Sequence, residues 1–353
     1  MSVERANART GPHMITASPG ARITPAAPQA NGDWRQLWRD AITDAGELLR
    51  LLDLGHLETG LPAEHAGFAL RVPRGFVARM RRGDASDPLL LQVLPQLAEL
   101  ALAPGYAVDA VGDMAARTAQ GVLHKYQGRA LLIASGSCAI NCRYCFRRHF
   151  PYGDEMAAAG QWRHALAHVR QDPSISELIL SGGDPLSLTT AKLEELTRGL
   201  ADIPSVTRLR IHTRLPVVLP ERVDDALLQW LAALPLQKVM VLHANHASEF
   251  DASVDRACAR LRDAGVTLLN QSVLLRGIND DAGTLAQLSE RLFAAGVLPY
   301  YLHQLDRVQG AAHFEVDDAH ALTLVEAVRQ QLPGYLVPKL VREVGGDASK
   351  RPL

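Results

Sequence analysis

The 353-residue sequence predicts an α/β fold: a partial (β/α)6 barrel of the TIM type, preceded by a small N-terminal helical domain. Three observations lead to this prediction. From residue 129 onward, apolar β-branched runs alternate with amphipathic segments of helical length, which is typical of βαβ units around a parallel sheet. Six such units follow one another, which favours a partial barrel over a doubly wound sheet. Polar side chains gather where each apolar run ends, as they do in barrel enzymes.

The individual elements follow from these periodicities. The predicted strands are residues 130–135, 178–182, 209–214, 239–245, 266–275 and 299–305. The predicted helices of the barrel are residues 157–171, 190–202, 221–234, 251–264, 282–295 and 317–332. Because parallel strands end at one rim, we expect the polar residues that follow them to share a single site.

The chain before the barrel differs in composition and periodicity. Residues 1–32 are rich in Ala, Pro, Gly, Thr and Arg without periodicity, which predicts a disordered or loosely packed leader. Asp33 is the predicted N-cap of a helix whose apolar stripe runs from Trp34 to Leu52. Shorter helical segments follow around 74–82 and 88–101. The predicted divisions are the leader, a helical domain (33–115), the barrel (116–335) and a C-terminal segment (336–353).

Composition restricts the class of protein. A formal charge of −1 gives no basic field for nucleic acid, and no apolar run approaches the length of a transmembrane helix. The N-terminus lacks the apolar core of a secretory signal. Four cysteines, three of them clustered, are typical of a reducing cytoplasm. The fourth, Cys258, lies in a predicted helix and is expected to be a small buried hydrophobe.

The most informative motif is the C-x3-C-x2-C run of Cys138, Cys142 and Cys145, directly after the first predicted strand. Three thiolates can bind three irons of a 4Fe–4S cluster, and the fourth iron is then open to a ligand that is not protein. Alternatively, the three cysteines and His149 would form a tetrahedral zinc site in a structural module. A disulfide framework would need an oxidising compartment and more cysteines.

Two further motifs offer ligand contacts. In SGGDPL (181–186), Gly182 and Gly183 let the backbone approach a ligand closely, and their N–H groups can bind a carboxylate or phosphate. An ordinary tight turn is the alternative. In HKYQGR (124–129), Lys125, Tyr126 and Arg129 place three donors close together, which suits a phosphate dianion. Such a group taken alone is more often a solvated surface.

Lys350 stands out because the chain has only five lysines and this one follows a Gly-Gly turn three residues from the end. Such a position is ordinarily a frayed tail. The functional alternative is a flexible lysine that forms a Schiff base with pyridoxal 5′-phosphate (PLP).

Together these segments resemble the lysine 2,3-aminomutase family of radical AdoMet (S-adenosylmethionine) enzymes. The similarity runs from about residue 70 to the end and rests on CAINCRYCFRRHFPY, SGGDPL, LLNQSVLLRGIND, PYYLHQLDRVQGAAHF and GYLVPKLVREVGGDASK. The chain is most similar to the branch that makes β-lysine for modification of elongation factor P. The resemblance implies a radical AdoMet barrel and an isomerase that converts (S)-α-lysine to β-lysine, with the (R) product inferred from the branch.

The resemblance also assigns cofactors and residues. It implies a 4Fe–4S cluster on Cys138, Cys142 and Cys145, with AdoMet on the open iron. The residues it places beside AdoMet are Gly182, Gly183, Asp184 at the methionine ammonium, His212 and Gln271. The residues it places at PLP are Lys350 as the Schiff base and Lys125, Tyr126 and Arg129 at the phosphate. For the substrate it implies Arg147 at the carboxylate, and Asp306 and Glu343 at the ε-ammonium, with Glu343 where free-lysine enzymes have Asp.

The resemblance further implies partners and leaves alternatives. The expected partners are L-lysine, elongation factor P with its lysyl-transferring ligase, and a flavodoxin-type electron donor; no nucleic acid or membrane is expected. A chain ending at Leu353 is typical of the elongation factor branch, because free-lysine enzymes continue into extensions that help assemble oligomers. An aminomutase for glutamate or arginine is the alternative, although Asp306 and Glu343 would repel the side chain of glutamate.

Overall fold

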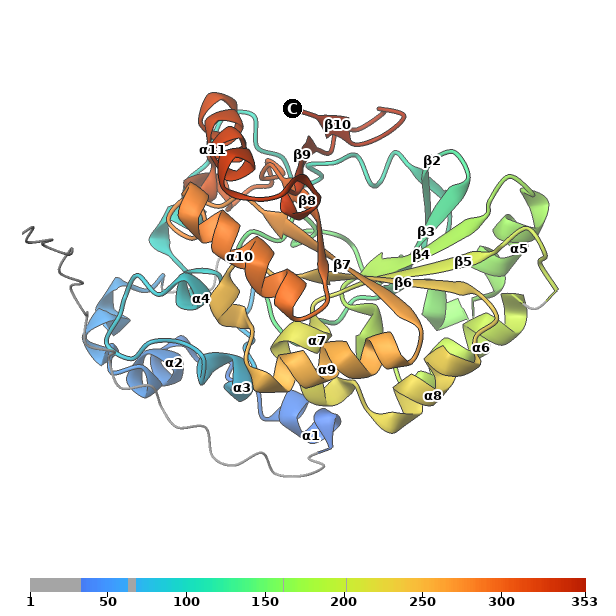
Figure 1. Cartoon of the computed structure of the whole chain (residues 1–353), viewed down its shortest axis with the longest axis horizontal. Coiled ribbons are helices and arrows are strands. Elements are labelled where there is room, and N and C mark those ends of the chain that lie inside the picture. Colours follow the sequence, from blue (N-terminus) through green and yellow to red (C-terminus); the bar gives the residue numbers. More distant parts are fainter. Residues whose placement is uncertain (1–32, 63–67, 161, 201) are drawn as a thin grey trace, which may run out of the picture.

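The computed structural model of the chain describes residues 33–62, 68–160, 162–200 and 202–353, so the predicted leader lies outside the described residues. The framework is a ten-stranded sheet in which the strands follow chain order from β1 to β10. All neighbouring pairs from β3 to β9 are parallel, while β1–β2, β2–β3 and β9–β10 are antiparallel. Figure 1 shows the strands fanned through the molecule with helices along their outer side.

The six predicted strands are confirmed as β3 to β8, each within two residues at either end. The ten strands are β1 (Arg117–Ala119), β2 (Val122–Tyr126), β3 (Arg129–Ser135), β4 (Glu177–Gly182), β5 (Arg208–Thr213), β6 (Gln237–His243), β7 (Val266–Val273), β8 (Leu298–His303), β9 (Lys339–Arg342) and β10 (Arg351–Pro352). The four strands that were not predicted are short or polar, and they lie at the two ends of the sheet. They matter for function because β2 carries Lys125 and Tyr126, and β9 and β10 flank Lys350.

One main helix follows each of the strands β3 to β8, which confirms the partial (β/α)6 barrel. These helices are α5 (Arg163–Gln171), α6 (Thr190–Leu200), α8 (Asp225–Ala233), α9 (Ala252–Asp263), α10 (Ala282–Ala294) and α11 (Asp318–Gln331). The prediction for 221–234 begins too early, because the Asp224 carboxylate accepts a hydrogen bond from Leu227 N and starts the helix there. A short helix, α7 (Leu215–Val218), follows β5 directly.

The N-terminal helix predicted from Trp34 to Leu52 is in fact two helices, α1 (Trp34–Arg39) and α2 (Ala45–Leu51). The break has a tertiary cause: Ile42 and Val72 exchange two backbone hydrogen bonds of 2.9 and 3.0 Å, which removes residue 42 from any helix. The Asp44 side chain then caps α2. Two further short helices are α3 (Arg74–Val77) and α4 (Pro88–Leu91).

One apolar core joins the N-terminal helices to the barrel. Leu48 and Leu49 of α2 belong to the same buried cluster as Leu132 of β3 and Leu180 of β4. Burying a leucine side chain stabilises the fold by about 2 kcal/mol, so this packing fixes the strand ends relative to the N-terminal segment. Cys258 is fully buried in α9, as expected. Among the described residues, no helix has the length and apolar character needed to cross a membrane.

Candidate active site

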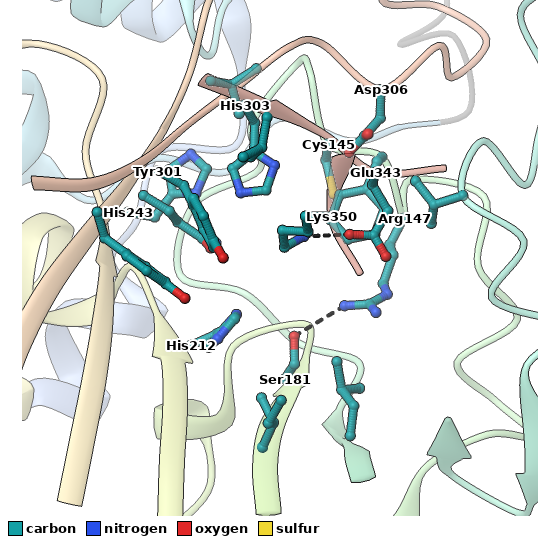
Figure 2. A pocket seen from close by; sticks show the side chains of 18 of the residues that line it. Cys145, Arg147, Ser181, His212, His243, Tyr301, His303, Asp306, Glu343 and Lys350 are labelled. Carbon is teal, nitrogen blue, oxygen red and sulfur yellow. Dashed lines mark hydrogen bonds and ion pairs between the residues drawn. The ribbon is translucent and has the colours of Figure 1, made fainter. Parts of the chain in front are cut away.

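A cavity of about 810 Å³ opens at the carboxyl ends of the barrel strands, and its size is at the upper end for small-molecule sites. The structure brings every predicted site residue to this cavity. They are Lys125, Tyr126, Arg129, Cys138, Cys142, Cys145, Arg147, Gly182, Gly183, Asp184, His212, Gln271, Asp306, Glu343 and Lys350. Figure 2 shows the labelled side chains of several strands and of the C-terminal segment pointing into one space.

The cysteine loop and the glycine turn pack backbone against backbone. Gly182 has a φ of +110°, and a Cβ on Gly183 would lie 2.7 Å from the carbonyl oxygen of Ser137. Gly183 N donates to Ser135 O at 2.7 Å. This N–H is therefore used within the protein, and ligand binding at the glycine turn stays a prediction that the contact does not support. The glycines are required because only residues without a Cβ let the two loops approach so closely.

Asp184 connects the ends of two strands. Its Oδ1 atom accepts from Leu186 N and the Thr213 hydroxyl at 3.0 and 2.6 Å, and its Oδ2 atom accepts from Arg214 N and Leu215 N at 2.8 and 3.0 Å. These bonds use all four lone-pair positions of a carboxylate. The contact between Asp184 and the AdoMet ammonium stays a prediction that this geometry does not support.

The three cysteines surround one end of the cavity. Burial raises the pKa of the Cys138 thiol well above its usual value and that of Cys145 to about 11. No three His, Cys, Asp or Glu side chains among the described residues lie close enough to ligate one ion, whereas a cubane takes each thiolate at a different iron. His149 does not line the cavity; its ring contacts Gln309 O at 3.3 Å. The Cys3His arrangement is thus not assembled, while three separated thiols at one cavity end fit a cluster.

Behind Cys142 lies a buried polar network that ties four parts of the chain together. Arg214 Nη1 lies 2.7 Å from Cys142 Sγ and donates at 2.7 Å to the Tyr144 hydroxyl. Arg214 Nη2 donates to Gln92 Oε1 at 2.6 Å and to Glu249 Oε2 at 2.8 Å. Arg214 is the last residue of the predicted strand 209–214, where polar residues were expected, but no pattern in the sequence selects Gln92, Tyr144 or Glu249.

Lys350, on the C-terminal segment, lines the same cavity as the three cysteines. Lys350 Nζ forms an ion pair with Glu343, and the other carboxylate oxygen of Glu343 accepts from the Tyr126 hydroxyl at 2.6 Å. Lys350 Nζ also lies 6.0 Å from the centre of the Tyr301 ring. The antiparallel pair β9–β10 holds this segment against the barrel, so Lys350 is not in a frayed tail. Figure 2 shows the Lys350–Glu343 contact.

A single carboxylate, Asp113, orients two of the basic residues. Its Oδ1 atom lies 2.7 Å from Lys125 Nζ, and its Oδ2 atom accepts from Arg147 Nε at 2.7 Å. Arg147 Nη1 donates to the Ser181 hydroxyl at 3.0 Å. The neighbouring cations hold the pKa of Asp113 below its usual value although burial opposes this. Sequence reasoning missed Asp113 because it precedes the barrel and belongs to no recognisable motif.

The cavity also contains buried groups without protein partners. Within the described part of the chain, His212 Nε2, His303 Nε2 and Asp306 Oδ1 have no hydrogen-bond partner. Burial lowers the pKa of both histidines well below the usual value, so the rings are neutral. Burial raises the pKa of Asp306 to about 7. Such unsatisfied buried groups cost free energy unless they are paired, and they are available to a polar ligand.

Comparison with known proteins shows which family the chain resembles. The Radical SAM superfamily model matches residues 132–288. The chain is 50% identical to the L-lysine 2,3-aminomutase of Escherichia coli, covering 91% of this chain and 94% of the relative. It is 44% identical to that of Haemophilus influenzae, covering 93% and 98%, and 32% identical to that of Clostridium subterminale, covering 91% and 77%.

The chain belongs to the L-lysine 2,3-aminomutase family. It is therefore an isomerase with a radical SAM domain, and a 4Fe–4S cluster and AdoMet are the cofactors of that domain. The matched residues 132–288 begin in β3 and include the three cysteines. Lys350, Glu343, Lys125 and Asp306 lie outside the matched range, so the structure itself is what brings them to the same cavity.

Proposed function

We propose that this chain is an L-lysine 2,3-aminomutase that moves the amino group of L-lysine from Cα to Cβ to make β-lysine. The observation that carries the proposal is the placement of Lys350 and its partner Glu343 in the same cavity as the three cysteines. A radical SAM domain alone does not require a lysine there. A lysine amine beside a phosphate-binding group is what a PLP enzyme needs.

The residues present fit both cofactors. Cys138, Cys142 and Cys145 would hold the cluster, and Lys350 would hold PLP. When bound, the reduced cluster with AdoMet would supply hydrogen-atom abstraction, and PLP would supply an aldehyde carbon that bonds to the migrating nitrogen. Arg129 stacks over the Tyr126 ring at 4.5 Å, next to Lys125 on the same hairpin. Lys125 and Arg129 suit the phosphate of PLP, whereas the Tyr126 hydroxyl donates to Glu343 in this structure.

The remaining groups bind and orient the substrate. Arg147 is fixed at Nε and Nη1 by Asp113 and Ser181, so its Nη2 edge is presented to a substrate carboxylate. Glu343 already holds one primary ammonium, that of Lys350, and the ε-ammonium of lysine is the same chemical group. Asp306 offers a second carboxylate without a partner for its Oδ1 atom among the described residues.

The test is anaerobic incubation of the reconstituted chain with AdoMet, PLP, dithionite and L-lysine, followed by chiral chromatography for β-lysine. We expect product from the wild type and none from Cys142→Ala or Lys350→Ala. Lys192→Ala is the matched control, because Lys192 lies on α6 and pairs with Glu195 at 2.8 Å, far from the cysteine loop in the sequence. AdoMet cleavage without β-lysine would reject the substrate, and absence of a cluster would reject the whole proposal.

The same assay separates lysine from other amino acids. Asp306 and Glu343 place carboxylates where the substrate side chain would end, which disfavours glutamate. We expect Asp306→Ala to abolish lysine turnover, and we expect neither glutamate nor arginine to give a β-amino acid. Unchanged lysine turnover in Asp306→Ala would remove this argument.

We also propose that the β-lysine, of (R) configuration, serves the modification of elongation factor P in the cytoplasm, with a flavodoxin-type donor reducing the cluster. The four cysteines of the described residues are all free thiols, which supports a reducing compartment. The test is to add elongation factor P and its lysyl-transferring ligase to the reaction. Mass spectrometry should show transfer of the product to the factor, and no transfer would reject this link.

A further inference from the structure

A buried guanidinium stands beside a cluster cysteine, and the lysine chemistry proposed above does not use it. Arg214 Nη1 lies 2.7 Å from Cys142 Sγ, and the Arg214 side chain is 7% exposed. We propose that Arg214 is a positioning residue that raises the reduction potential of the iron–sulfur cluster through Cys142, with Glu249 as its counter-charge. This inference rests on the cluster and on no property of the substrate.

The surrounding contacts fix the direction of the guanidinium. Glu249 is fully buried; its Oε2 atom accepts from Arg214 Nη2 at 2.8 Å and its Oε1 atom accepts from Asn245 N at 2.7 Å. Gln92 Oε1 accepts from the same Nη2 at 2.6 Å. Because one edge of the planar fork is held in this way, Nη1 is directed at Cys142 and Tyr144.

The effect on reduction follows from charge. Reduction transfers one electron from an external one-electron donor to the cluster, with no bond broken, and adds one negative charge. Hydrogen bonds to cluster sulfurs and nearby charges set the potential of such clusters. A cation that donates to a ligating sulfur stabilises the added electron, and low-dielectric surroundings strengthen this interaction. Glu249 binds the other edge of the guanidinium, so its negative charge acts in the opposite direction from a greater distance.

We therefore expect neutral replacements of the two members of the ion pair to shift the midpoint potential of the cluster in opposite directions. Arg214→Gln should move the midpoint potential to a more negative value, and Glu249→Gln should move it to a more positive value. Arg214→Lys keeps the charge and should lie between Arg214→Gln and the wild type. Simple damage to the fold would not produce opposite signs.

A matched control separates loss of a buried arginine from loss of this contact. Arg222 is fully buried and donates from Nε to Leu186 O at 2.7 Å and from Nη2 to Leu188 O at 3.1 Å, without contact to a cysteine. Arg222→Gln should leave the potential of the cluster unchanged. A shift as large as that of Arg214→Gln would show that any buried arginine has this effect, and would overturn the inference.

The experiment is a redox titration of the full reconstituted chain without AdoMet, using dithionite and following the reduced cluster by electron paramagnetic resonance. Iron and sulfide content reports loading. Wild-type potentials in loaded Arg214→Gln and Glu249→Gln would overturn the inference. If Arg214→Gln does not retain a cluster, Glu249→Gln decides alone, and an unchanged potential there overturns it. Lysine turnover is measured separately, so shifted potentials without β-lysine would reject only the proposed reaction.

Discussion

The two ends of the cavity hold their charges in different ways. At the cysteine end, Arg214 and Glu249 form an ion pair, and the Gln92 side chain and Asn245 N make further hydrogen bonds to it. At the other end, three basic side chains lie among three carboxylates. These residues are Lys125, Arg147, Lys350, Asp113, Glu343 and Asp306. Among the described residues, the cysteine end leaves the donor Arg214 Nε unpaired, whereas the second end leaves the acceptor Asp306 Oδ1 unpaired and can therefore bind a cation that a ligand supplies.

The largest effect is expected at the end of the cavity that contains Lys350 and Glu343. Glu343→Gln removes the partner of Lys350 and leaves the Tyr126 hydroxyl with a neutral acceptor. We expect lysine turnover to fall by about 10²-fold or more, since substrate and Lys350 ammonium groups both lose a buried counter-ion. Steady-state assays measure this, with iron content as the control for an intact cluster. Turnover within twofold of the wild type would show that the negative charge of Glu343 is not needed at this end of the cavity.

The second prediction concerns pH and stability. The pKa of Asp306 is about 7 in the folded chain and lower in the unfolded chain, so the folded state binds the proton more tightly. The contribution of this carboxyl to stability is therefore lost as pH rises from about 4 to about 7. Asp306→Asn cannot ionise, and at pH 8 it should be about 2–4 kcal/mol more stable than the wild type.

Urea unfolding at pH 5 and pH 8 measures this difference. The stability gap between Asp306→Asn and the wild type should be larger at pH 8 than at pH 5. A gap that is equal at both pH values would mean that the Asp306 carboxylate is already paired within the protein.

The third prediction concerns Asn245, in the buried polar network at the cysteine end. Asn245 donates from Nδ2 to Gln92 Oε1 at 3.0 Å and to the Tyr144 hydroxyl at 2.6 Å, and its Oδ1 atom accepts from Val273 N at 2.8 Å. Asn245→Ala removes the side-chain acceptor of Val273 N and one donor each from Gln92 Oε1 and the Tyr144 hydroxyl, and should destabilise the fold by about 2 kcal/mol. Gln331→Ala is the control, because Gln331 is exposed on α11. Equal unfolding midpoints for both variants would contradict the prediction.

Local sequence patterns were predictable, whereas contacts between distant parts of the chain were not. The strands β3 to β8 and the residues that follow them were predictable because periodicity is local and parallel strands end at one rim. The break at Ile42 was not, because it depends on pairing with Val72. Asp113, which lines the cavity, and Gln92, which bonds to Arg214, were not, because both lie in the segment before the barrel. Asp184 was assigned to a ligand because its spacing gives no sign that four protein donors surround its carboxylate.

The smallest effect is expected from a charge pair that is near Lys350 in sequence but outside the cavity. Arg351 Nη2 lies 2.9 Å from Asp347 Oδ2, and the two side chains are 57% and 28% exposed. Solvent screens such a pair, so Arg351→Ala should change stability by no more than about 0.5 kcal/mol and leave lysine turnover within twofold. Unfolding and turnover measured beside Glu343→Gln check this. A large loss in Arg351→Ala would mean that the turn before β10, and not the buried carboxylate, holds Lys350 in place.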